Sequence, residues 1–572
     1  MAGAIPAEAT FTNPVLPGTH PDPSICRVPG SDGAPDDYYL VTSTFEYFPG
    51  LPVFHSHDLV TWTQVGHAIH RTDQVDLSSV PSSGGLYAAT IRHHAGTFFV
   101  VTTLVHTQGQ GGHLLVTATD PAGPWSDPVW LEGDGIDPSL FVDDSTGRVW
   151  LTATRLADPG EWEGQTEVWL RELDLAAGAL VGPEHVLWRG ALHGAVWAEG
   201  PHLYRVGSHY YLLASEGGTE HRHAVSVARA DTVTGPYTGN PANPVLTHRH
   251  LGRDFPVVGV GHADLVKTAA DEWWMVLLGS RPYGGYYPNL GRETFLAPVV
   301  WEDGWPVVAP GVGHVAGTFP LPDVGARLPR AGIPAGVGAV VVHETFDGPG
   351  ERLDLAWNQV RTGDRFWSLT ERPWHLRLPL LPATLSDVAT PAFLGRRQQH
   401  TDMDLTVRVD VDPAGPDEWA GLAVRQSEEA WIAAVVTRAE SVAVPGGAAI
   451  RPVGAVSGSV PGTVPSPAPG GREVLVVERS GGEEVVVGRA ALGPLGLAEG
   501  PVDVVLHAVG QEYAFGVRTL RGFHAVATVH GGRLSSPEAG GFLGVWVGPY
   551  ATGRGTTTAT VADVECVEYR GR

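Results

Sequence analysis

Thr19-His20-Pro21-Asp22-Pro23-Ser24-Ile25-Cys26 is the stretch from which the fold of this chain can be worked out. Its acid, Asp22, stands between two prolines and directly before a short apolar run. Proline fixes φ and biases the preceding residue to an extended backbone, so we expect the Asp22 carboxylate on a stiff segment where a strand begins. A proline-rich turn is the competing interpretation of this stretch, and the recurrence of the pattern along the chain decides against it.

Short runs rich in aromatic and β-branched residues recur about 50 to 60 residues apart in the first half of the chain, and such runs are typical of strands in a repeated unit. The five runs are residues 37–41, 97–101, 148–152, 209–213 and 272–276. Each follows another short strand, and we expect these upstream strands to begin at Asp22, Ala89, Asp137, Glu199 and His262. Five similar units predict a five-bladed β-propeller whose first strands line a central channel.

Four of these five strand starts carry a side chain capable of acid–base chemistry: Asp22, Asp137, Glu199 and His262. A propeller brings equivalent positions of its first strands to one end of the channel, so we expect these four side chains to converge. Any one of them could instead cap a turn, but four at corresponding positions favour a site. Two carboxyl groups flanking a bond are the minimum for glycoside hydrolysis, and a third raises the pKa of the acid by like-charge repulsion.

Composition places the chain among large globular β proteins. Its 572 residues are too many for one core, and 43% hydrophobic with 17% charged residues is an ordinary balance. The 74 glycines and 47 prolines, with little helical periodicity, favour an all-β protein with many turns. A formal net charge of −25 argues against nucleic acid or an anionic membrane as partner and suits a neutral ligand. The oligomeric state stays open, a homo-oligomer included.

The ends of the chain and its cysteines add little chemistry. Residues 1–10 have neither a basic region nor a long apolar run, so the expected location is cytoplasmic. Cys26 and Cys566 are the two cysteines, and they fall in different expected domains. They provide neither a disulfide framework nor a zinc-ligand spacing.

The expected domains are a propeller over residues 11–318, a Pro-, Gly- and Ala-rich linker over 319–342, and a β-sandwich of jelly-roll, lectin-like type over 343–572. Residues 403–411 alternate apolar and polar side chains, which is the pattern of a half-buried strand. Similar strands are expected within 419–437, 472–488, 502–518 and 541–566. The low-complexity insert at 443–471 is expected to be a loop.

Three residues outside the channel strands are further candidates for the site. Phe45 belongs to an unusually aromatic loop, which predicts either a small hydrophobic core or a wall on which a sugar ring stacks. Tyr87 precedes the second channel strand and is expected near the channel mouth. Arg292 is a candidate substrate contact, with a surface ion pair as the alternative.

Six motifs along the propeller resemble glycoside hydrolase family 43. They are Asn13-Pro14-Val15 with His20-Pro21-Asp22-Pro23-Ser24, Ser43-Thr44-Phe45-Glu46, Asp137-Pro138-Ser139-Leu140-Phe141, Ala198-Glu199-Gly200-Pro201-His202, Glu216-Gly217-Gly218-Thr219 and Gly291-Arg292-Glu293-Thr294. They occur in the family's order. The second domain resembles the β-sandwich of β-xylosidases of this family, so the resemblance covers almost the whole chain.

The resemblance implies that Asp22 is the general base, that Glu199 is the general acid, and that Asp137 orients this acid and tunes its pKa. It also implies an inverting reaction. His262 matches a channel histidine that in related enzymes lies beneath the sugar or near a structural calcium ion, so a metal at His262 is one expectation. No cofactor is required for the chemistry itself.

The resemblance places Phe45, Thr219 and Arg292 around the terminal sugar. Two positions that border the site depart from the family pattern: many relatives have Trp where this chain has Tyr87, and some xylosidases have Phe at Ile136. These departures leave the preferred pentose and the aglycone open.

The leading functional expectation is an exo-acting β-xylosidase that releases xylose from β-1,4-xylo-oligosaccharides. An α-L-arabinofuranosidase acting on arabinoxylan fragments is the close alternative, and one enzyme could carry both activities because the two sugars present similar geometry. A retaining glycosidase is a further alternative. A non-catalytic carbohydrate-binding propeller is the alternative from another class, and three converging acids argue against it.

Overall fold

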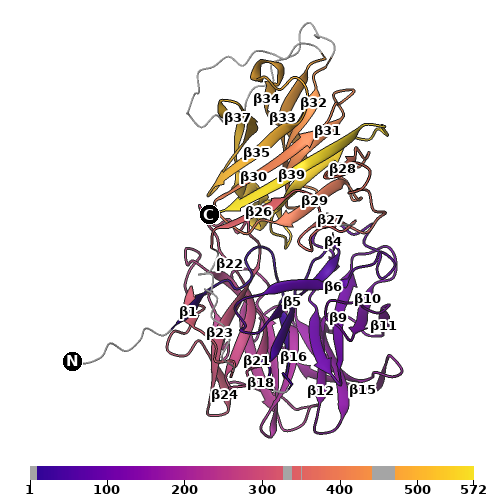
Figure 1. Ribbon diagram of the computed structural model, residues 1–572. Coiled ribbons are helices and arrows are strands. Elements are labelled where there is room, and N and C mark those ends of the chain that lie inside the picture. Colours follow the sequence, from indigo (N-terminus) through magenta and orange to yellow (C-terminus); the bar gives the residue numbers. More distant parts are fainter. Residues whose placement is uncertain (1–8, 32, 326–337, 349–350, 441–469) are drawn as a thin grey trace, which may run out of the picture. The chain divides into compact units, whose positions relative to one another are not determined.

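The computed structural model describes residues 9–31, 33–325, 338–348, 351–440 and 470–572. The chain divides into two compact units, Met1–Gly338 and Ala339–Arg572, each nearly all β (Figure 1). Residues 326–337 of the expected linker and almost all of the expected 443–471 insert lie outside the described residues. Within the described ranges, none of the helices combines the length and the apolar character that crossing a membrane requires.

The first unit is a five-bladed β-propeller, as the sequence predicts. Each blade is an antiparallel sheet of consecutive strands. The blades consist of β2 (Ser24–Val28), β3 (Asp37–Val41), β5 (Gly50–Ser56) and β6 (Thr63–Ile69); β7 (Gly85–Leu86), β8 (Thr90–His94), β9 (Thr97–Val105), β10 (Gly112–Ala118) and β11 (Val129–Leu131); β12 (Ile136–Asp143), β13 (Arg148–Leu156), β14 (Thr166–Asp174) and β15 (Ala179–Trp188); β16 (Glu199–Val206), β17 (His209–Glu216), β18 (Ala224–Ala230), β19 (Thr238–Gly239) and β20 (Leu246–Thr247); and β21 (Val258–Lys267), β22 (Trp273–Ser280), β23 (Glu293–Glu302) and β24 (Trp305–Val308).

The first strands of the blades form a closed ring. Contacts run from β2 to β8, β8 to β12, β12 to β16, β16 to β21, and β21 back to β2. The five aromatic runs seen in the sequence correspond to β3, β9, β13, β17 and β22, each of which pairs with the channel strand of its blade. Their large side chains, such as Tyr38 and Trp274, are buried in the cores that fill the wedges between blades. The aromatic runs therefore recur because each blade packs against its neighbour in the same way.

The N-terminal segment fastens the last blade. Strand β1 (Thr10–Thr12) pairs with β25 (Thr318–Pro320), and the Asn13 side chain exchanges two hydrogen bonds of 2.9 Å with the Leu296 backbone on β23. The chain then continues directly into β2 of the first blade. Segments far apart in sequence thus hold the ring shut, which keeps the channel strands at fixed positions. The short strand β4 (Tyr47–Phe48) belongs to the loop after β3.

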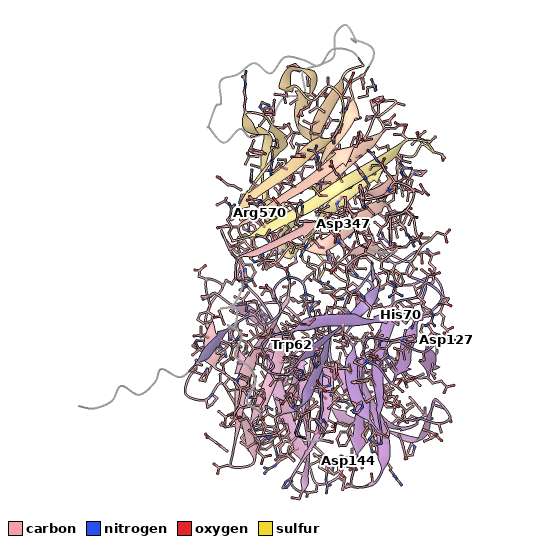
Figure 2. All side chains as sticks on the ribbon, viewed as in Figure 1. Trp62, His70, Asp127, Asp144, Asp347 and Arg570 are labelled. Carbon is pink, nitrogen blue, oxygen red and sulfur yellow. The ribbon has the colours of Figure 1, made fainter. Side chains whose placement is uncertain are left out.

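In each blade a turn joins the first two strands. This turn lies at the opposite end of the hairpin from the start of the first strand. Asp144, in the turn between β12 and β13, marks this end for the third blade (Figure 2). Asp137 lies near the other end of β12. This separation gives the propeller two distinct ends, and only one of them carries the clustered acids.

The second unit is a sandwich of two antiparallel sheets, as expected. One sheet runs in the order β26-β39-β30-β35-β36-β37, with β28 also pairing with β39, and the other in the order β34-β33-β32-β31-β38-β29-β27. The bounds are β26 (Val340–Glu344), β27 (Asn358–Val360), β28 (Leu376–Pro379), β29 (Ala392–Arg397), β30 (Met403–Asp410), β31 (Trp419–Arg425), β32 (Trp431–Arg438), β33 (Arg472–Ser480), β34 (Glu483–Ala491), η1 (Gly493–Leu495), β35 (Val502–Val509), β36 (Glu512–Thr519), β37 (Gly522–His530), η2 (Gly531–Leu534), α1 (Ser536–Ala539), β38 (Trp546–Thr552) and β39 (Val561–Gly571).

Strand β30 shows how the sandwich core is built. Met403, Leu405, Val407 and Val409 are all buried in the core, as their alternation in the sequence predicts. Thr406, from the polar face, is also buried, and its Oγ1 accepts a hydrogen bond of 3.1 Å from an Arg518 side-chain nitrogen. The polar face of this strand is therefore covered by hydrogen-bonded side chains.

Candidate active site

Three of the five channel strands pair irregularly beside a predicted site residue. Counting from the paired residues Ser24, Ser139, His202 and Asp264, the residues two positions earlier are Asp22, Asp137, Gly200 and His262. The ladder is interrupted at this point in β12, β16 and β21. Such bulges re-aim side chains and are frequent beside active sites.

All four of these positions adopt a left-handed backbone. The φ angles are 54° for Asp22, 56° for Asp137, 57° for Gly200 and 45° for His262. For a residue with a side chain this conformation costs about 1–3 kcal/mol, and such strain clusters at functional sites. The strain marks the strand starts as a place where geometry is maintained at the expense of stability.

Glu199 stands one residue before the position that corresponds to Asp22 and Asp137. The corresponding position is Gly200, where an added Cβ would lie 3.0 Å from Cε1 of His262, closer than an ordinary contact. A side chain there would require the imidazole to shift, which favours glycine at this position. The acid of the fourth blade is the preceding residue, Glu199. His262 also differs from the expectation, because it lies inside β21 rather than at its start.

The Asp22 carboxylate is buried and held by three groups. Its Oδ2 accepts a hydrogen bond of 2.6 Å from Ser43 Oγ, and its Oδ1 accepts one of 2.9 Å from an Arg292 side-chain nitrogen. The Nδ1 of His262 lies 3.8 Å from Oδ1. Burial alone would raise the pKa of Asp22, but Arg292 and the other neighbours outweigh it and hold the pKa below its ordinary value. Asp22 is therefore an ionised carboxylate at neutral pH.

Asp137 connects the third blade to the fourth. Its buried Oδ2 accepts a hydrogen bond of 3.0 Å from the backbone N–H of Gly200, the residue after Glu199. Burial raises the pKa of Asp137, and the charge of Asp22 adds to this effect. A buried carboxylate that bonds to the backbone beside another acid can both orient that acid and act on its charge.

Glu199 has the opposite tendency to Asp22. Burial raises its pKa well above the ordinary value, and the negative charges of Asp137 and Asp22 raise it further. The environment thus favours the ionised form of one carboxyl group of the cluster and the protonated form of another. This is the pairing that an acid and a base acting on one bond require.

His223 is a buried neutral imidazole beside Glu199. Its Nδ1 donates to the Gly259 carbonyl over 3.2 Å, which leaves Nε2 as an acceptor 3.8 Å from Glu199 Oε1. Burial lowers the pKa of His223 to about 3. Nε2 has no hydrogen-bond partner among the described residues, so it is available to a proton on Glu199 or to a ligand hydroxyl.

Arg292 contacts three of the other predicted site residues. The nitrogen that donates to Asp22 also donates to Thr219 Oγ1 over 3.0 Å, and the guanidinium lies 5.5 Å from the centre of the Phe45 ring. Phe45 in turn meets Tyr87 edge to face at 5.6 Å. The structure therefore joins Phe45, Tyr87, Thr219 and Arg292 into one set of contacts around Asp22. The surface ion pair considered for Arg292 is ruled out, because its side chain is only 11% exposed.

Tyr87 and Ile136 occupy the remaining predicted positions. The Tyr87 hydroxyl donates to the Ser83 carbonyl over 3.0 Å, and burial with the nearby Asp137 raises its pKa to about 12. Buried Glu46 accepts from Ser82 Oγ, which fixes the loop before Tyr87. Ile136 is half-buried at the first position of β12, directly before Asp137.

A half-buried arginine, Arg92, connects three of the channel strands. Arg92 donates to Asp264 Oδ2 over 2.8 Å and to His202 Nδ1 over 3.1 Å. The oxygens of Asp264 also accept hydrogen bonds from Ser24 at 2.7 Å and from Tyr204 at 2.5 Å. Calcium needs six to eight oxygen ligands, whereas here a guanidinium already neutralises the buried carboxylate and would repel a second cation. The described residues around His262 therefore do not fit a calcium ion.

Three residues of this neighbourhood were missed as site candidates in the sequence. Ser43, quoted only within a motif, bonds to Asp22, and His223 lies beside Glu199 without any pattern that distinguishes it from other histidines. Trp197 is 40% exposed two residues before Glu199, with a φ of 54°. An exposed aromatic residue next to a predicted acid was the one signal that could have found Trp197.

Family models match both units of the chain. The model of glycosyl hydrolases family 43 matches residues 11–306, and a model of the beta-xylosidase C-terminal concanavalin A-like domain matches residues 343–459 and 466–570. The first range contains every predicted site residue. The second range covers the sandwich.

Known proteins resemble the chain over its whole length. It is 37% identical over 566 residues to a xylosidase/arabinosidase of Butyrivibrio fibrisolvens, covering 96% of this chain and 97% of the relative. It is 36% identical over 574 residues to the non-reducing end alpha-L-arabinofuranosidase BoGH43B of Bacteroides ovatus, covering 100% and 96%. A solved structure described as Bacteroides ovatus xyloglucan PUL GH43B matches with a TM-score of 0.84 and 35% identity, covering 99% of this chain and 100% of that one.

Proposed function

The chain belongs to glycoside hydrolase family 43, and on this premise we propose that it is an exo-acting, inverting enzyme that releases terminal xylose from β-1,4-xylo-oligosaccharides. The observation that carries the proposal is the opposite tuning of two carboxyl groups. Asp22 has a lowered pKa and Glu199 a raised one, within a single cluster. The family resemblance assigns these same residues as base and acid.

The reaction follows from these two states. The Asp22 carboxylate takes a proton from a water molecule, and the water oxygen forms a bond to the anomeric carbon of the terminal sugar. The glycosidic C–O bond breaks on the opposite face, and Glu199 gives its proton to the leaving oxygen. The configuration at the anomeric carbon inverts because one displacement occurs. Solvent then restores the proton on Glu199 and removes the one on Asp22.

The other predicted residues hold the sugar in this scheme. Phe45 offers an aromatic face, while Arg292 and Thr219 offer polar groups close to Asp22. His262 lies beneath the sugar, with Tyr87 and Ile136 at the border of its binding site. Arg292 has two roles. The nitrogen that would contact a sugar hydroxyl also lowers the pKa of Asp22 and so keeps it ionised.

An α-L-arabinofuranosidase activity is the second candidate, either alone or beside xylosidase activity. It is favoured by the names of the two relatives, one of which is a xylosidase/arabinosidase and the other a non-reducing end alpha-L-arabinofuranosidase. The non-reducing-end action named for the second relative also supports exo action here. Arabinose side groups of arabinoxylan fragments are the natural substrate class for this candidate.

Paired assays test the proposal. Values of kcat/KM for 4-nitrophenyl β-D-xyloside and 4-nitrophenyl α-L-arabinofuranoside give the preferred pentose, and product profiles from xylotetraose show whether single xylose units are released. Proton NMR during early hydrolysis of 4-nitrophenyl β-D-xyloside should show α-xylose first. First appearance of β-xylose would indicate retention, and release of internal fragments would contradict exo action.

A further inference from the structure

Two histidines and an aspartate meet on the first blade, away from the acids of the channel end. His55 Nε2 lies 2.7 Å from Asp37 Oδ1, and His57 Nδ1 lies 3.3 Å from the same oxygen. One ligand atom from each of the three residues falls within 4.8 Å of the others. These are the donor types that transition metals prefer, two imidazoles and a carboxylate.

The strand register explains why the three side chains meet. Asp37 begins β3 and His55 lies near the end of β5, its cross-strand partner being Tyr39. Because Tyr38 pairs with Ser56, the next step of this antiparallel ladder sets Asp37 opposite His57. Side chains two residues apart share a face of a strand, so both histidines point to the side of the sheet that Asp37 occupies.

This cluster lies at the opposite end of the blade from Asp22. In β2 and β3, Ser24, two residues after Asp22, pairs with Val41, whereas Asp37 pairs with Val28 at the other end of the hairpin. The metal-ligand candidates are therefore separated from the proposed hydrolytic site by the length of this strand pair. Any property of the cluster can be changed without altering a residue of that site.

The separations suit a small cation after a modest adjustment. Ligand atoms of a tetrahedral zinc ion with bonds of about 2.05 Å lie about 3.3 Å apart. The His57–Asp37 distance of 3.3 Å already has this value, and the His55–Asp37 distance of 2.7 Å would have to open slightly. The His57 side chain is 44% exposed, which leaves room for water as a further ligand.

Neighbouring groups hold the imidazoles in place. The His55 ring packs against Tyr39 in a tilted arrangement with centroids 5.1 Å apart, and the two imidazole rings meet edge to face at 4.6 Å. His57 Nδ1 also lies 3.1 Å from the Asp36 carbonyl oxygen, to which its N–H donates when no metal is bound. Ring orientations fixed by packing lower the entropy that a metal must overcome on binding.

We propose that Asp37, His55 and His57 form a binding site for a divalent transition metal, with Zn²⁺ as the ion that suits them best. Calcium and magnesium prefer sites made of oxygen ligands and fit poorly here. Binding requires that His57 Nδ1 and His55 Nε2 carry no proton, so each neutral imidazole must hold its proton on the other ring nitrogen when the ion is bound. The bound ion links β3 to β5 at the outer end of the first blade, which should stabilise the folded chain.

Titration of the full-length, EDTA-treated protein with ZnCl₂ in a calorimeter tests the site. We expect one tight Zn²⁺ site in the parent protein, weakened by about tenfold or more in His57→Ala and in Asp37→Asn. The matched control is His209→Ala, which removes a surface histidine that pairs with Asp231 at 3.4 Å without a second histidine. His209→Ala should bind Zn²⁺ like the parent. His57 is exposed, so its loss should leave the fold intact, as far-UV circular dichroism will verify.

Two further measurements separate a built site from scattered surface histidines. Co²⁺ should give visible absorption bands of a low-coordinate site in the parent protein and in His209→Ala, but not in His57→Ala. Zn²⁺ should raise the melting temperature of the parent protein and of His209→Ala, but not that of His57→Ala. Equal Zn²⁺ isotherms for the parent and His57→Ala, or Ca²⁺ binding as tightly as Zn²⁺, would overturn the proposal. Hydrolysis of the aryl xyloside by the metal-free variants should equal that of the parent, whatever the outcome for zinc.

Discussion

The Asp137 carboxylate accepts a hydrogen bond from the backbone N–H of Gly200, 3.0 Å away and directly after Glu199. This bond spans two blades, so it fixes where the fourth blade begins relative to the third. It also places a buried negative charge beside Glu199, and that charge is one of the causes of the raised pKa of Glu199. A single contact thereby serves orientation and proton affinity together.

Replacing Asp137 by Asn should separate these two effects. The amide oxygen of Asn can still accept from Gly200, while the charge is removed, so the pKa of Glu199 should fall. Glu199 then loses its proton at lower pH, and the alkaline limb of the kcat/KM profile should move to lower pH. The profile on xylobiose between pH 4 and pH 9 measures this shift.

Asp144→Asn is the control for this substitution. It removes the same charge from the same blade, in the exposed turn between β12 and β13 (Figure 2). Its pH profile should match that of the parent enzyme. An Asp137→Asn profile that keeps both limbs and full activity would show that Asp137 has no tuning role.

Arg292→Met should act on the other limb. Burial raises the pKa of Asp22, and Arg292 is the largest influence that lowers it. Without the guanidinium the pKa of Asp22 should rise, so Asp22 becomes protonated at higher pH. The acid limb of kcat/KM should therefore move to higher pH, beside any loss of sugar binding. An acid limb that stays in place while KM rises would restrict Arg292 to substrate contact.

Asp22→Ala should remove the base that activates water. General base catalysis contributes about 10²–10⁴-fold, and kcat on xylobiose should fall by a factor in this range. Binding of xylose, followed by tryptophan fluorescence, should persist if the variant is folded. Near-normal turnover of xylobiose would exclude Asp22 as the base.

Glu199→Ala should discriminate between leaving groups. The leaving group of xylobiose is a xylose unit, whose alkoxide is strongly basic, so its departure depends on protonation by the acid. A 4-nitrophenolate is a good leaving group and needs little protonation. We expect a far greater loss of kcat on xylobiose than on the aryl xyloside. Equal losses on the two substrates would indicate that Glu199 supports the structure and does not donate the proton.

The fold could be predicted because each blade packs against its neighbours in the same way. Aromatic second strands such as 37–41 and 209–213 fill the wedges between blades, so their spacing counted the blades correctly. The strand starts were less exact: β2 begins at Ser24 rather than Asp22, and His262 lies inside β21. A bulge displaces the ladder beside His262, and a bulge leaves no reliable mark in sequence.

Only those site residues that lie at or beside equivalent positions of the repeat could be predicted from the repeat pattern. Asp22, Asp137 and Glu199 sit at or beside corresponding positions, but Glu199 is offset by one residue, beside a glycine that lies close to His262. Contacts such as Arg292 with Asp22, 270 residues apart, arise from closure of the ring. Likewise, Asp37, His55 and His57 meet through the register of β3 and β5, which the residue spacing does not reveal.

Arg92 is a further residue that the sequence did not single out, and its removal offers a test of the channel. It is the cation paired with Asp264, whose side chain is fully buried. Although burial raises the pKa of Asp264, Arg92 and the other partners hold this pKa well below its ordinary value. The pair therefore stabilises the fold at pH values above the unfolded pKa of about 3.9, and this contribution is lost as the pH falls toward the folded pKa.

Arg92→Leu should accordingly destabilise the propeller by about 3–5 kcal/mol at pH 7, because a buried carboxylate is left without its partner. The deficit relative to the parent should shrink near pH 4, where Asp264 can take up a proton. Melting temperatures at the two pH values measure this, with Lys267→Ala, which breaks an exposed pair with Asp271, as the control expected to change little. An equal deficit at both pH values would indicate lost packing instead of lost charge.

Because the guanidinium already supplies the positive charge, added Ca²⁺ should leave the melting temperature of the parent protein unchanged, and a clear rise would show that a calcium ion does enter the channel.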